Sequence, residues 1–440
     1  MAENNLRNLT GKISPVKAFP FALQQILAMF VTNLVPVWTI GAVAGLSESM
    51  RLVLAQNAMV IAGIATLIQC TPIWKIGSGL PIFMGMSFTF MVPLTAVAAR
   101  YGYGALVGSV IIGGCVEGIL GLTAQYWKKM IAPIVAATVV TGIGLSLLGT
   151  AARSFGGGYA TDFGAIHNLV PGAVTIAACI TWQVLTRGSK RQLSILVGLA
   201  AGYITAAFFG KIDFPEFSSV SWFALPKFLP FKPEFHLDSI LAVIIIYMVS
   251  ATETIGDVSA IARGALKRPV ETREITGALT VDGFGSAFGG LFGVSPVTSY
   301  SENVGLTIMT GVINRNVARL GAAIMVFCGL FPPIGYFLQT VPSSVIGGVL
   351  LVVMGQILIS GCQMIADAGF TFRNKLIAAL SLAIGIGFTT SSEAGIWDSF
   401  PVLVKSIFAQ NIVAIVFFMS FFLNLVFPKD LEDKEDQGAK

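Results

Sequence analysis

Charged residues are scarce in this sequence, and their scarcity excludes a water-soluble protein. Asp, Glu, Lys and Arg make up 11% of the 440 residues, whereas soluble domains contain about 25%. Hydrophobic residues make up 55%, and the mean hydropathy is +0.81. Because a membrane-spanning helix needs about 20 apolar residues, the composition predicts an all-α polytopic membrane protein.

Histidine and cysteine are also rare. The two histidines, His167 and His236, fall in or beside expected loops, and no CxxC or Cys/His spacing occurs. We expect the five cysteines to be small core residues: Cys70, Cys115, Cys179, Cys328 and Cys362. These patterns argue against a disulfide framework and a zinc or haem site, so no metal and no cofactor are expected. The net charge of +5 reports topology in such a chain, so no nucleic-acid partner is expected.

Fourteen apolar segments follow one another along the chain. Seven precede a polar stretch at 211–236: 19–40, 52–70, 80–99, 103–123, 131–151, 168–186 and 193–210. Seven follow it: 237–258, 275–294, 296–312, 317–335, 343–361, 376–392 and 407–427. If the segments alternate across the bilayer, most of the 27 Lys and Arg residues share one side with both termini, and the positive-inside rule makes that side cytoplasmic.

The stretch at 211–236 divides the chain into two halves of seven segments each. An odd number of spans inverts the second half, which is the organisation of inverted-repeat transporters. We therefore expect a cytoplasmic N-terminal segment, a first repeat, an extracytoplasmic linker, a second repeat and a cytoplasmic tail. Their boundaries are 1–18, 19–210, 211–236, 237–427 and 428–440.

The third span of each half is interrupted in the same way. Residues 81–93 and 295–305 are rich in Pro, Gly, Ser and β-branched residues, which favours a short extended stretch leading into a half helix. Irregular backbone at membrane depth must be buried or line a cavity. We expect the two stretches to pair as short antiparallel strands and to direct two helix N-termini at a ligand. The alternative is a pair of proline kinks in ordinary spans.

Acidic residues within spans are default functional candidates, because each costs at least about 2.5 kcal/mol there. Glu253 and Asp257 are four residues apart, so they share one face of the eighth span, where like charges favour a bound proton. Asp282 and Glu302 lie in the ninth and tenth spans. No Lys or Arg accompanies them, so a proton or an NH-rich neutral substrate fits. The alternative is that each acid reaches the membrane interface, and Glu117 in the fourth span is as consistent with a structural contact as with a site.

Five short motifs resemble one transporter family. Glu302-Asn303-Val304-Gly305, followed by Thr310-Gly311, matches the signature of the nucleobase-ascorbate transporter family. The chain is also similar to bacterial xanthine and uracil permeases at 23–30, 85–88, 253–257 and 330–332. The resemblance covers essentially all fourteen spans.

The resemblance implies a proton-coupled nucleobase symporter in the bacterial cytoplasmic (inner) membrane, working by an elevator-like mechanism. Spans 1–4 and 8–11 would form a core domain, and spans 5–7 and 12–14 a gate domain that carries a homodimer interface. The implied substrate-binding residues are Glu253, Glu302, Phe88, Ser301, Thr32 and Asn303, and the implied proton-coupling residues are Asp257, Asp282 and Glu253. Phe88 would also stack on the base.

The resemblance gives two conflicting indications of the substrate. Asp257 stands where xanthine and urate permeases tend to have Asp and uracil permeases His, whereas a signature beginning with Glu302 is typical of uracil permeases. We favour xanthine or urate and keep uracil as the alternative. Gln25 replaces a His of many relatives, so a titrating imidazole is lost from the first span.

Two other classes fit less well. An anion exchanger of the sulfate-transporter type shares the architecture, but four acids in the site oppose an anionic substrate. An intramembrane aspartyl protease using Asp257 and Asp282 would need a Gly-x-Gly-Asp loop, and Thr254 occupies its first Gly position. Neither HExxH nor GxSxG occurs, so no enzyme activity is expected.

Overall fold

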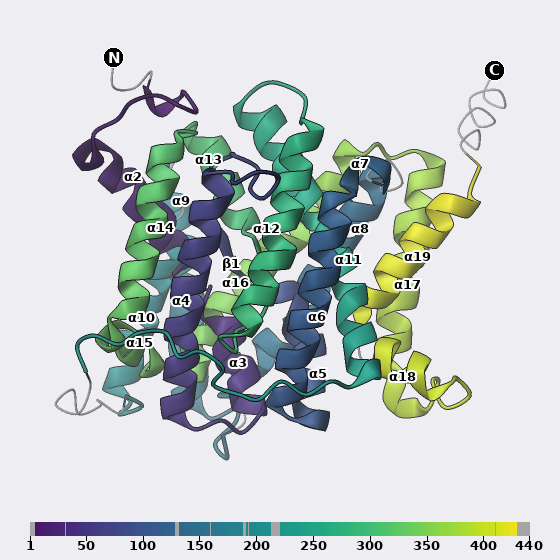
Figure 1. Ribbon diagram of the computed structural model, residues 1–440. Helices are drawn as coiled ribbons and strands as arrows, with labels where there is room; N and C mark the ends of the chain where they lie inside the picture. Colours follow the sequence, from purple (N-terminus) through teal and green to yellow (C-terminus); the bar gives the residue numbers. More distant parts are fainter. Residues whose placement is uncertain are drawn as a thin grey trace.

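The chain folds into a bundle of helices around one pair of short strands (Figure 1). This computed structural model describes residues 5–30, 32–127, 132–158, 160–187, 191, 193–212, 221–409 and 411–428. Seven of the described helices are long and apolar enough to cross a membrane: Glu48–Cys70, Tyr103–Leu122, Pro133–Phe155, Ile166–Leu185, Leu237–Ala265, Ser343–Asp367 and Phe372–Thr390. The predicted all-α membrane class is confirmed.

Every predicted apolar segment contains a helix. The first half has α2 (Pro15–Met29), α3 (Val35–Val43), α4 (Glu48–Cys70), α5 (Met91–Tyr101), α6 (Tyr103–Leu122), α7 (Ala124–Trp127), α8 (Pro133–Phe155), α9 (Ile166–Leu185) and α10 (Ser194–Phe208). The second half has α11 (Leu237–Ala260), α12 (Thr272–Gly290), α13 (Ser301–Thr310), α14 (Arg315–Leu330), α15 (Pro332–Gln339), α16 (Ser343–Asp367), α17 (Phe372–Thr390), α18 (Val402–Phe408) and α19 (Ile412–Val426).

The first segment differs from the prediction, because it is two helices and not one. α2 ends at Met29 and α3 begins at Val35. Pro36 lies in the first turn of α3, where a missing N–H costs nothing, whereas a helix continuing from α2 would lose a bond there. Asn33, within the break, uses its side chain to accept a hydrogen bond from Met86 N over 2.8 Å.

The two interrupted segments pair as predicted, and the alternative of simple proline kinks is wrong. Strand β1 (Met84–Met86) runs antiparallel to β2 (Val297–Ser299), with Gly85 opposite Thr298. Strand β1 leads into a 3-10 turn at Phe88–Phe90 and then α5, while β2 leads directly into α13. Helices α5 and α13 lie toward opposite ends of the bundle, with β1 between them (Figure 1).

Side chains satisfy the outer edges of this small sheet. Thr66 on α4 accepts from Met84 N over 2.9 Å, and Ser286 on α12 accepts from Val297 N over 2.9 Å. Unpaired backbone groups cost several kcal/mol in an apolar interior. The surrounding helices therefore make an isolated two-stranded sheet stable at this depth.

Glycine allows two helix pairs to approach closely. A Cβ on Gly283 of α12 would lie 2.1 Å from Gly118 N of α6, and a Cβ on Gly347 of α16 would lie 2.0 Å from Phe155 N of α8. Small residues at such crossings drive helix packing where lipid removes the hydrophobic force between helices. These close contacts fix the spacing of α6 against α12 and of α8 against α16.

The described part of the linker lacks helices, and the five cysteines differ in burial. Residues 221–236 contain no helix and run along the end of the bundle opposite to the start of α2 and the end of α19 (Figure 1). Residues 213–220 of the linker and 429–440 of the tail lie outside the described residues. Cys70 and Cys179 are buried as predicted and Cys328 is half-buried, but Cys115 and Cys362 are exposed, so their prediction as core residues is wrong.

Candidate functional site

A cavity of about 340 Å³ lies beside the strand pair. Its polar side comes from the segment after β1, from α11, and from the junction of β2 with α13. Its other side comes from α8 and α16, which contribute Val140, Ile143, Gln356, Ile357, Ser360 and Met364. Small-molecule sites are typically about 300–1,000 Å³, so the cavity has room for a small, flat ligand.

Glu253 is placed on the cavity wall by the middle of α11. Thr89 Oγ1 donates to Glu253 Oε2 over 2.9 Å, and Ser301 Oγ lies 3.3 Å from Glu253 Oε1. Thr89 follows β1 and Ser301 begins α13, so both interrupted segments orient this carboxyl. A carboxylate held by two hydroxyls keeps acceptor capacity for two ligand N–H groups.

Asp257 lines the cavity one turn further along α11, as its spacing from Glu253 predicts. It is 8% exposed, and its Oδ2 lies 2.7 Å from Ser299 Oγ and 3.0 Å from Ser301 Oγ. The two carboxyls thus share Ser301 as a neighbour. No cation accompanies them in the part of the chain that the structure describes, where every ion pair joins groups elsewhere.

Asp282 is fully buried on α12, behind the cavity wall. Thr254 donates its hydroxyl hydrogen to Asp282 Oδ2, and Thr254 Oγ1 also lies 3.1 Å from Ser299 Oγ. The other oxygen, Asp282 Oδ1, has no hydrogen-bond partner among the described residues. Asp282 is therefore connected to the cavity through the hydroxyl of Thr254 and through Ser299.

These contacts form one continuous chain, which we call the carboxyl–hydroxyl chain. In order, its members are Thr89, Glu253, Ser301, Asp257, Ser299, Thr254 and Asp282. Four hydroxyls, with one hydrogen each, serve six oxygen–oxygen contacts. Two contacts therefore have no hydroxyl hydrogen, and each proton added to a carboxyl can fill one of them.

Glu302 enters the cavity from the first turn of α13, as its position after the strand predicts. Both of its carboxyl oxygens and the hydroxyl of neighbouring Tyr300 are buried, and the hydroxyl of Thr32 is the polar neighbour of both residues. The first N–H groups of a helix have no intrahelical acceptor. The start of α13 therefore offers backbone donors to a ligand, with the Glu302 carboxyl buried directly behind them.

Thr32 and Asn303, which the resemblance implies as pocket residues, lie outside the cavity lining. Thr32 is fully buried and donates to Met29 O over 3.2 Å. Asn303 Nδ2 donates to Gln25 O over 2.9 Å and to Gln25 Oε1 over 2.8 Å, while Gln25 Nε2 donates to Thr307 Oγ1 over 3.1 Å. These contacts fasten α2 to α13, so Asn303 supports the site from behind.

The sequence reasoning missed several polar residues of the site. Thr89 and Ser299 follow or end the strands and hold the carboxyls. Gln356 and Ser360 line the cavity from α16. Their spacing of four residues on an otherwise apolar helix is a sequence signal for one polar face.

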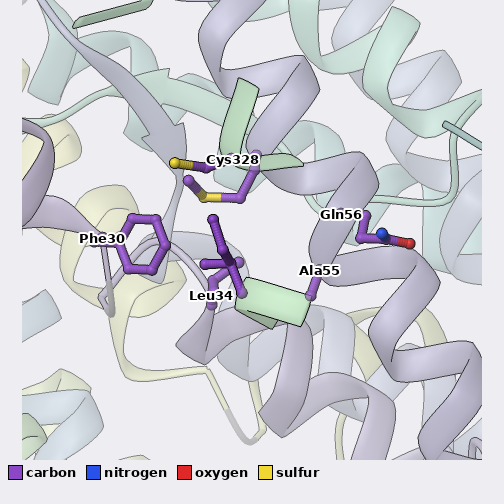
Figure 2. Close-up of a pocket in the computed structure, with 7 residues that line it drawn as sticks. Phe30, Leu34, Ala55, Gln56 and Cys328 are labelled. Carbon is purple, nitrogen blue, oxygen red and sulfur yellow. The ribbon is translucent and has the colours of Figure 1, made fainter. Parts of the chain in front are cut away.

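A second, much smaller cavity lies at the break between α2 and α3 (Figure 2). It has about 10 Å³ of space, which is the room one water needs. Phe30, Leu34, Ala55, Met59, Cys328 and Ile334 line it together with Gln56. In Figure 2 the Gln56 amide points away from Phe30 and Leu34, so the space is apolar and too small for an organic ligand.

Known proteins similar to this chain are membrane permeases. The chain is 31% identical to the uric acid permease PucJ of Bacillus subtilis (strain 168) over 436 residues, covering 96% of this chain and 95% of that protein. It is 30% identical to the xanthine permease XanQ of Escherichia coli (strain K12), covering 92% and 90%. It is 31% identical to the nucleobase transporter PlUacP of Paenibacillus larvae subsp. larvae, covering 90% and 92%.

Solved structures share the fold at low sequence identity. The transmembrane domain of a cyanobacterium bicarbonate transporter, BicA, superposes with a TM-score of 0.60 at 15% identity, covering 89% of this chain and 97% of that one. SLC26A9 superposes with a TM-score of 0.57 at 11% identity, covering 91% of this chain and 65% of that one. At these identities the likeness concerns the fold alone.

The sequence model of a permease family, Xan_ur_permease, matches residues 16–394. That range contains both strands, all four cavity and chain carboxyls, and the signature that begins at Glu302. The chain therefore belongs to this permease family, the nucleobase-ascorbate transporter family, and is a membrane transporter and not an enzyme.

Proposed function

We propose that the protein is a proton-coupled symporter that imports an oxopurine, xanthine or urate, across the bacterial cytoplasmic membrane. The observation that carries the proposal is the cavity itself, where Glu253, Asp257 and Glu302 face a space of about 340 Å³ without a cation among the described residues. The relatives named uric acid and xanthine permeases support the choice of an oxopurine. Uracil, a smaller base with the same pattern of N–H and C=O groups, is the alternative.

Each part of a planar oxopurine finds a complementary group. Glu253 accepts hydrogen bonds from adjacent ring N–H groups, and Glu302 accepts a further one. Backbone N–H groups at Phe88 and at Ser301, where helical turns begin, donate to the exocyclic oxygens. Phe88, which lines the cavity at 8% exposure, stacks on the ring.

The carboxyl–hydroxyl chain supports coupling to protons. Each proton that Asp257, Asp282 or Glu253 binds fills one of its two contacts without a hydroxyl hydrogen. Protonation also removes negative charge from an apolar interior, which lowers the cost of the loaded state. A membrane potential of 100 mV supplies about 2.3 kcal/mol per charge, enough for about 50-fold accumulation with one proton.

The arrangement of helices supports an elevator-like cycle. The helices of the first four and the eighth to eleventh spans would form a moving core, because they contain the strand pair and the carboxyls. The helices α8 to α10 and α16 to α19 would form the gate, in which α8 packs on α16 through glycine. Exposed apolar side chains on α9 and α19, such as Val184 and Phe418, suit lipid or a homodimer interface. We place both termini in the cytoplasm, on the side opposite to the linker.

An anion exchanger is a weaker candidate. The fold is shared with a bicarbonate transporter and with an anion transporter of another family. However, three acidic residues line this cavity, and their repulsion of an anion would need compensation by cations that the described lining lacks.

Uptake by reconstituted protein tests the proposal. Liposomes with an imposed inward proton gradient should accumulate labelled xanthine or urate, and a protonophore should abolish accumulation. Competition with unlabelled xanthine, urate, uracil and bicarbonate identifies the preferred substrate. Glu253→Gln should abolish accumulation, while Ser250→Ala, on the same helix and fully buried, should leave it unchanged. Accumulation that ignores the proton gradient, or that only bicarbonate inhibits, would refute the proposal.

A further inference from the structure

The loop between α4 and β1 carries an exposed tryptophan at the tip of a tight turn. Ile73 and Ile76 exchange two backbone hydrogen bonds, from Ile73 N to Ile76 O over 2.9 Å and from Ile76 N to Ile73 O over 3.0 Å. Between them, Trp74 has a positive φ of 53°, a left-handed conformation that is rare and costly for a bulky residue. Its side chain is 73% exposed. A strained residue whose side chain stays outside the core points to a contact beyond its own chain.

Helix α12 fixes this loop in place. Gly77 N donates to Gly277 O over 2.9 Å, and Thr280 Oγ1 donates to Lys75 O over 2.9 Å. A Cβ on Gly277 would lie 2.1 Å from Gly77 O, so the loop and the helix approach each other closely. The turn therefore presents Trp74 from a fixed support.

Two arginines of α14 donate to the two ends of the loop. Arg319 Nε donates to Thr71 Oγ1 over 2.8 Å, and Arg315 Nε donates to Gly79 O. Both arginines are half-buried, and because a guanidinium has five N–H groups, each keeps donors beyond these contacts. Arg315 N also donates to Leu9 O over 3.1 Å, which places the loop at the end of the bundle that carries the N-terminus.

Arg273 and Lys75 add two cations beside Trp74. Arg273 Nη2 donates to Trp74 O over 3.4 Å, and Lys75 Nζ lies 5.4 Å from the centre of the Trp74 ring. Among the described residues, no carboxylate forms an ion pair with these two side chains or with the two arginines of α14. Glu274, next to Arg273 in the chain, instead accepts from Arg268 Nη1 over 3.0 Å. Four cations therefore gather at one loop, and the acids of the described residues do not neutralise them.

Apolar side chains lie exposed beside these cations. Leu67, in the last turn of α4, is 45% exposed, and Ile73 is 63% exposed. In a chain that spans a membrane such side chains contact lipid, so the loop lies where acyl chains meet headgroups. Trp is enriched at this boundary, and clustered Lys and Arg next to it attract anionic headgroups. A soluble anion would contact the cations but would leave Ile73 and Trp74 in water.

We propose that this loop and its arginines form a binding site for an anionic phospholipid of the leaflet at this end of the bundle. Ile73 and Trp74 insert between the headgroups and the acyl chains, while Arg273, Arg315 and Arg319 donate to the lipid phosphate. None of these residues lines the cavity of about 340 Å³, so the lipid site is separate from it. The inference does not depend on which substrate the protein transports.

Binding of defined lipids to the purified protein tests this inference. Native mass spectrometry of the protein in detergent, titrated with phosphatidylglycerol or with phosphatidylcholine, gives a dissociation constant for each lipid. The wild type should bind phosphatidylglycerol at least about tenfold more tightly, because several cations face its headgroup. Arg273→Gln should weaken the binding of phosphatidylglycerol about fivefold, which is the contribution of one cation near an anionic headgroup, and leave phosphatidylcholine unchanged. Arg263→Gln removes an exposed cation from the turn after α11 and is the matched control, which should leave both constants unchanged.

Three outcomes would overturn the inference. Equal affinity of the wild type for the two lipids, or equal effects of Arg273→Gln and Arg263→Gln, would leave the arginines as determinants of topology alone. Trp74→Ala should weaken the binding of both lipids, since apolar insertion does not depend on headgroup charge, and unchanged binding would refute insertion. Displacement of phosphatidylglycerol by millimolar inorganic phosphate would identify a soluble anion as the ligand. Arg273 and Trp74 are exposed, so both variants should keep the wild-type melting temperature.

Discussion

Glu253 and Asp257 flank a single hydroxyl group, because Ser301 Oγ lies 3.3 Å from Glu253 Oε1 and 3.0 Å from Asp257 Oδ2. Ser301 has one hydrogen and can donate to only one of the two acids at a time. Since Ser301 also begins α13 at the end of β2, the state of the two carboxyls is linked to the helix start that faces the ligand. A substrate bound at this helix start thus contacts the same residue that both acids share.

Removal of the hydroxyls around Glu253 should weaken substrate binding. Thr89→Val and Ser301→Ala each delete one donor to this carboxyl, and hydrogen bonds to charged groups contribute about 1.5–3 kcal/mol. We expect KM to rise about tenfold or more in each variant, measured by initial rates of uptake. Ser250→Ala is the control, because its fully buried hydroxyl has no partner among the described residues. Equal KM values in all three variants would show that the hydroxyls do not orient Glu253.

The contact between α6 and α12 should tolerate no added methyl group at its centre. Gly283→Ala would place a Cβ 2.1 Å from Gly118 N, so the helices would have to separate and Asp282 would move with them. We expect loss of transport and a lower unfolding temperature in detergent. Gly285→Ala, on the same helix, would place its Cβ 3.8 Å from Ala65 Cβ and should behave like the wild type. Similar melting of both variants would contradict close packing at Gly283.

A cluster of charged residues at the start of α9 should give a pH-dependent contribution to stability, and its Asp162 lies outside the membrane-spanning helices. Lys211 donates to Asp162, and His167 Nε2 lies 2.7 Å from Asp162 Oδ2. The hydrogen bond from Lys211 lowers the pKa of the Asp162 carboxyl most, and the contact with His167 lowers it further. Together they hold this pKa well below its usual range. A lowered pKa in the folded state stabilises the protein above the usual Asp pKa of about 4, and the stabilisation is lost as the pH falls below it.

Asp162→Asn should therefore lower the unfolding temperature at pH 7, and the difference from the wild type should shrink below about pH 4. Asp398→Asn is a control, since its pair with Lys405 lies on an exposed surface and should contribute less. A difference for Asp162→Asn that stays constant from pH 7 to pH 3 would contradict the role of its ionised form.

The residues that carry the largest energetic penalty were the ones that the sequence could identify. Intramembrane acids are costly, so Glu253 and Glu302 stand out in an apolar sequence, and the interrupted segments stand out through Pro, Gly and Ser. The hydroxyl Thr89 does not stand out, because Thr is common in spans and its partner Glu253 is 164 residues away. The resemblance placed Asn303 in the pocket, but its amide is used by Gln25. Such pairings depend on tertiary contacts that no local pattern encodes.

The wall opposite the acids should determine which heterocycle fits. Gln356 and Ser360 lie one turn apart on α16 and are exposed to the cavity, so they can meet the edge of a bicyclic base that points away from Glu253. An amide offers both donors and an acceptor, whereas a one-ring base bound at Glu253 leaves this edge empty. Gln356→Leu should therefore weaken the binding of xanthine and urate more than the binding of uracil.

The expected size of this effect follows from the loss of one polar contact. A site built to bind a polar group loses about 1–3 kcal/mol when the partner is removed, or about 5- to 150-fold in affinity. Inhibition constants for xanthine, urate and uracil, measured by competition against one labelled substrate, give the ratio directly. Met364→Leu, an apolar change in the same helix and lining, is the matched control. If Gln356→Leu lowered the affinity for all three bases equally, α16 would close the cavity without contributing to substrate specificity. Specificity would then depend on Glu253, Glu302 and the strand ends alone.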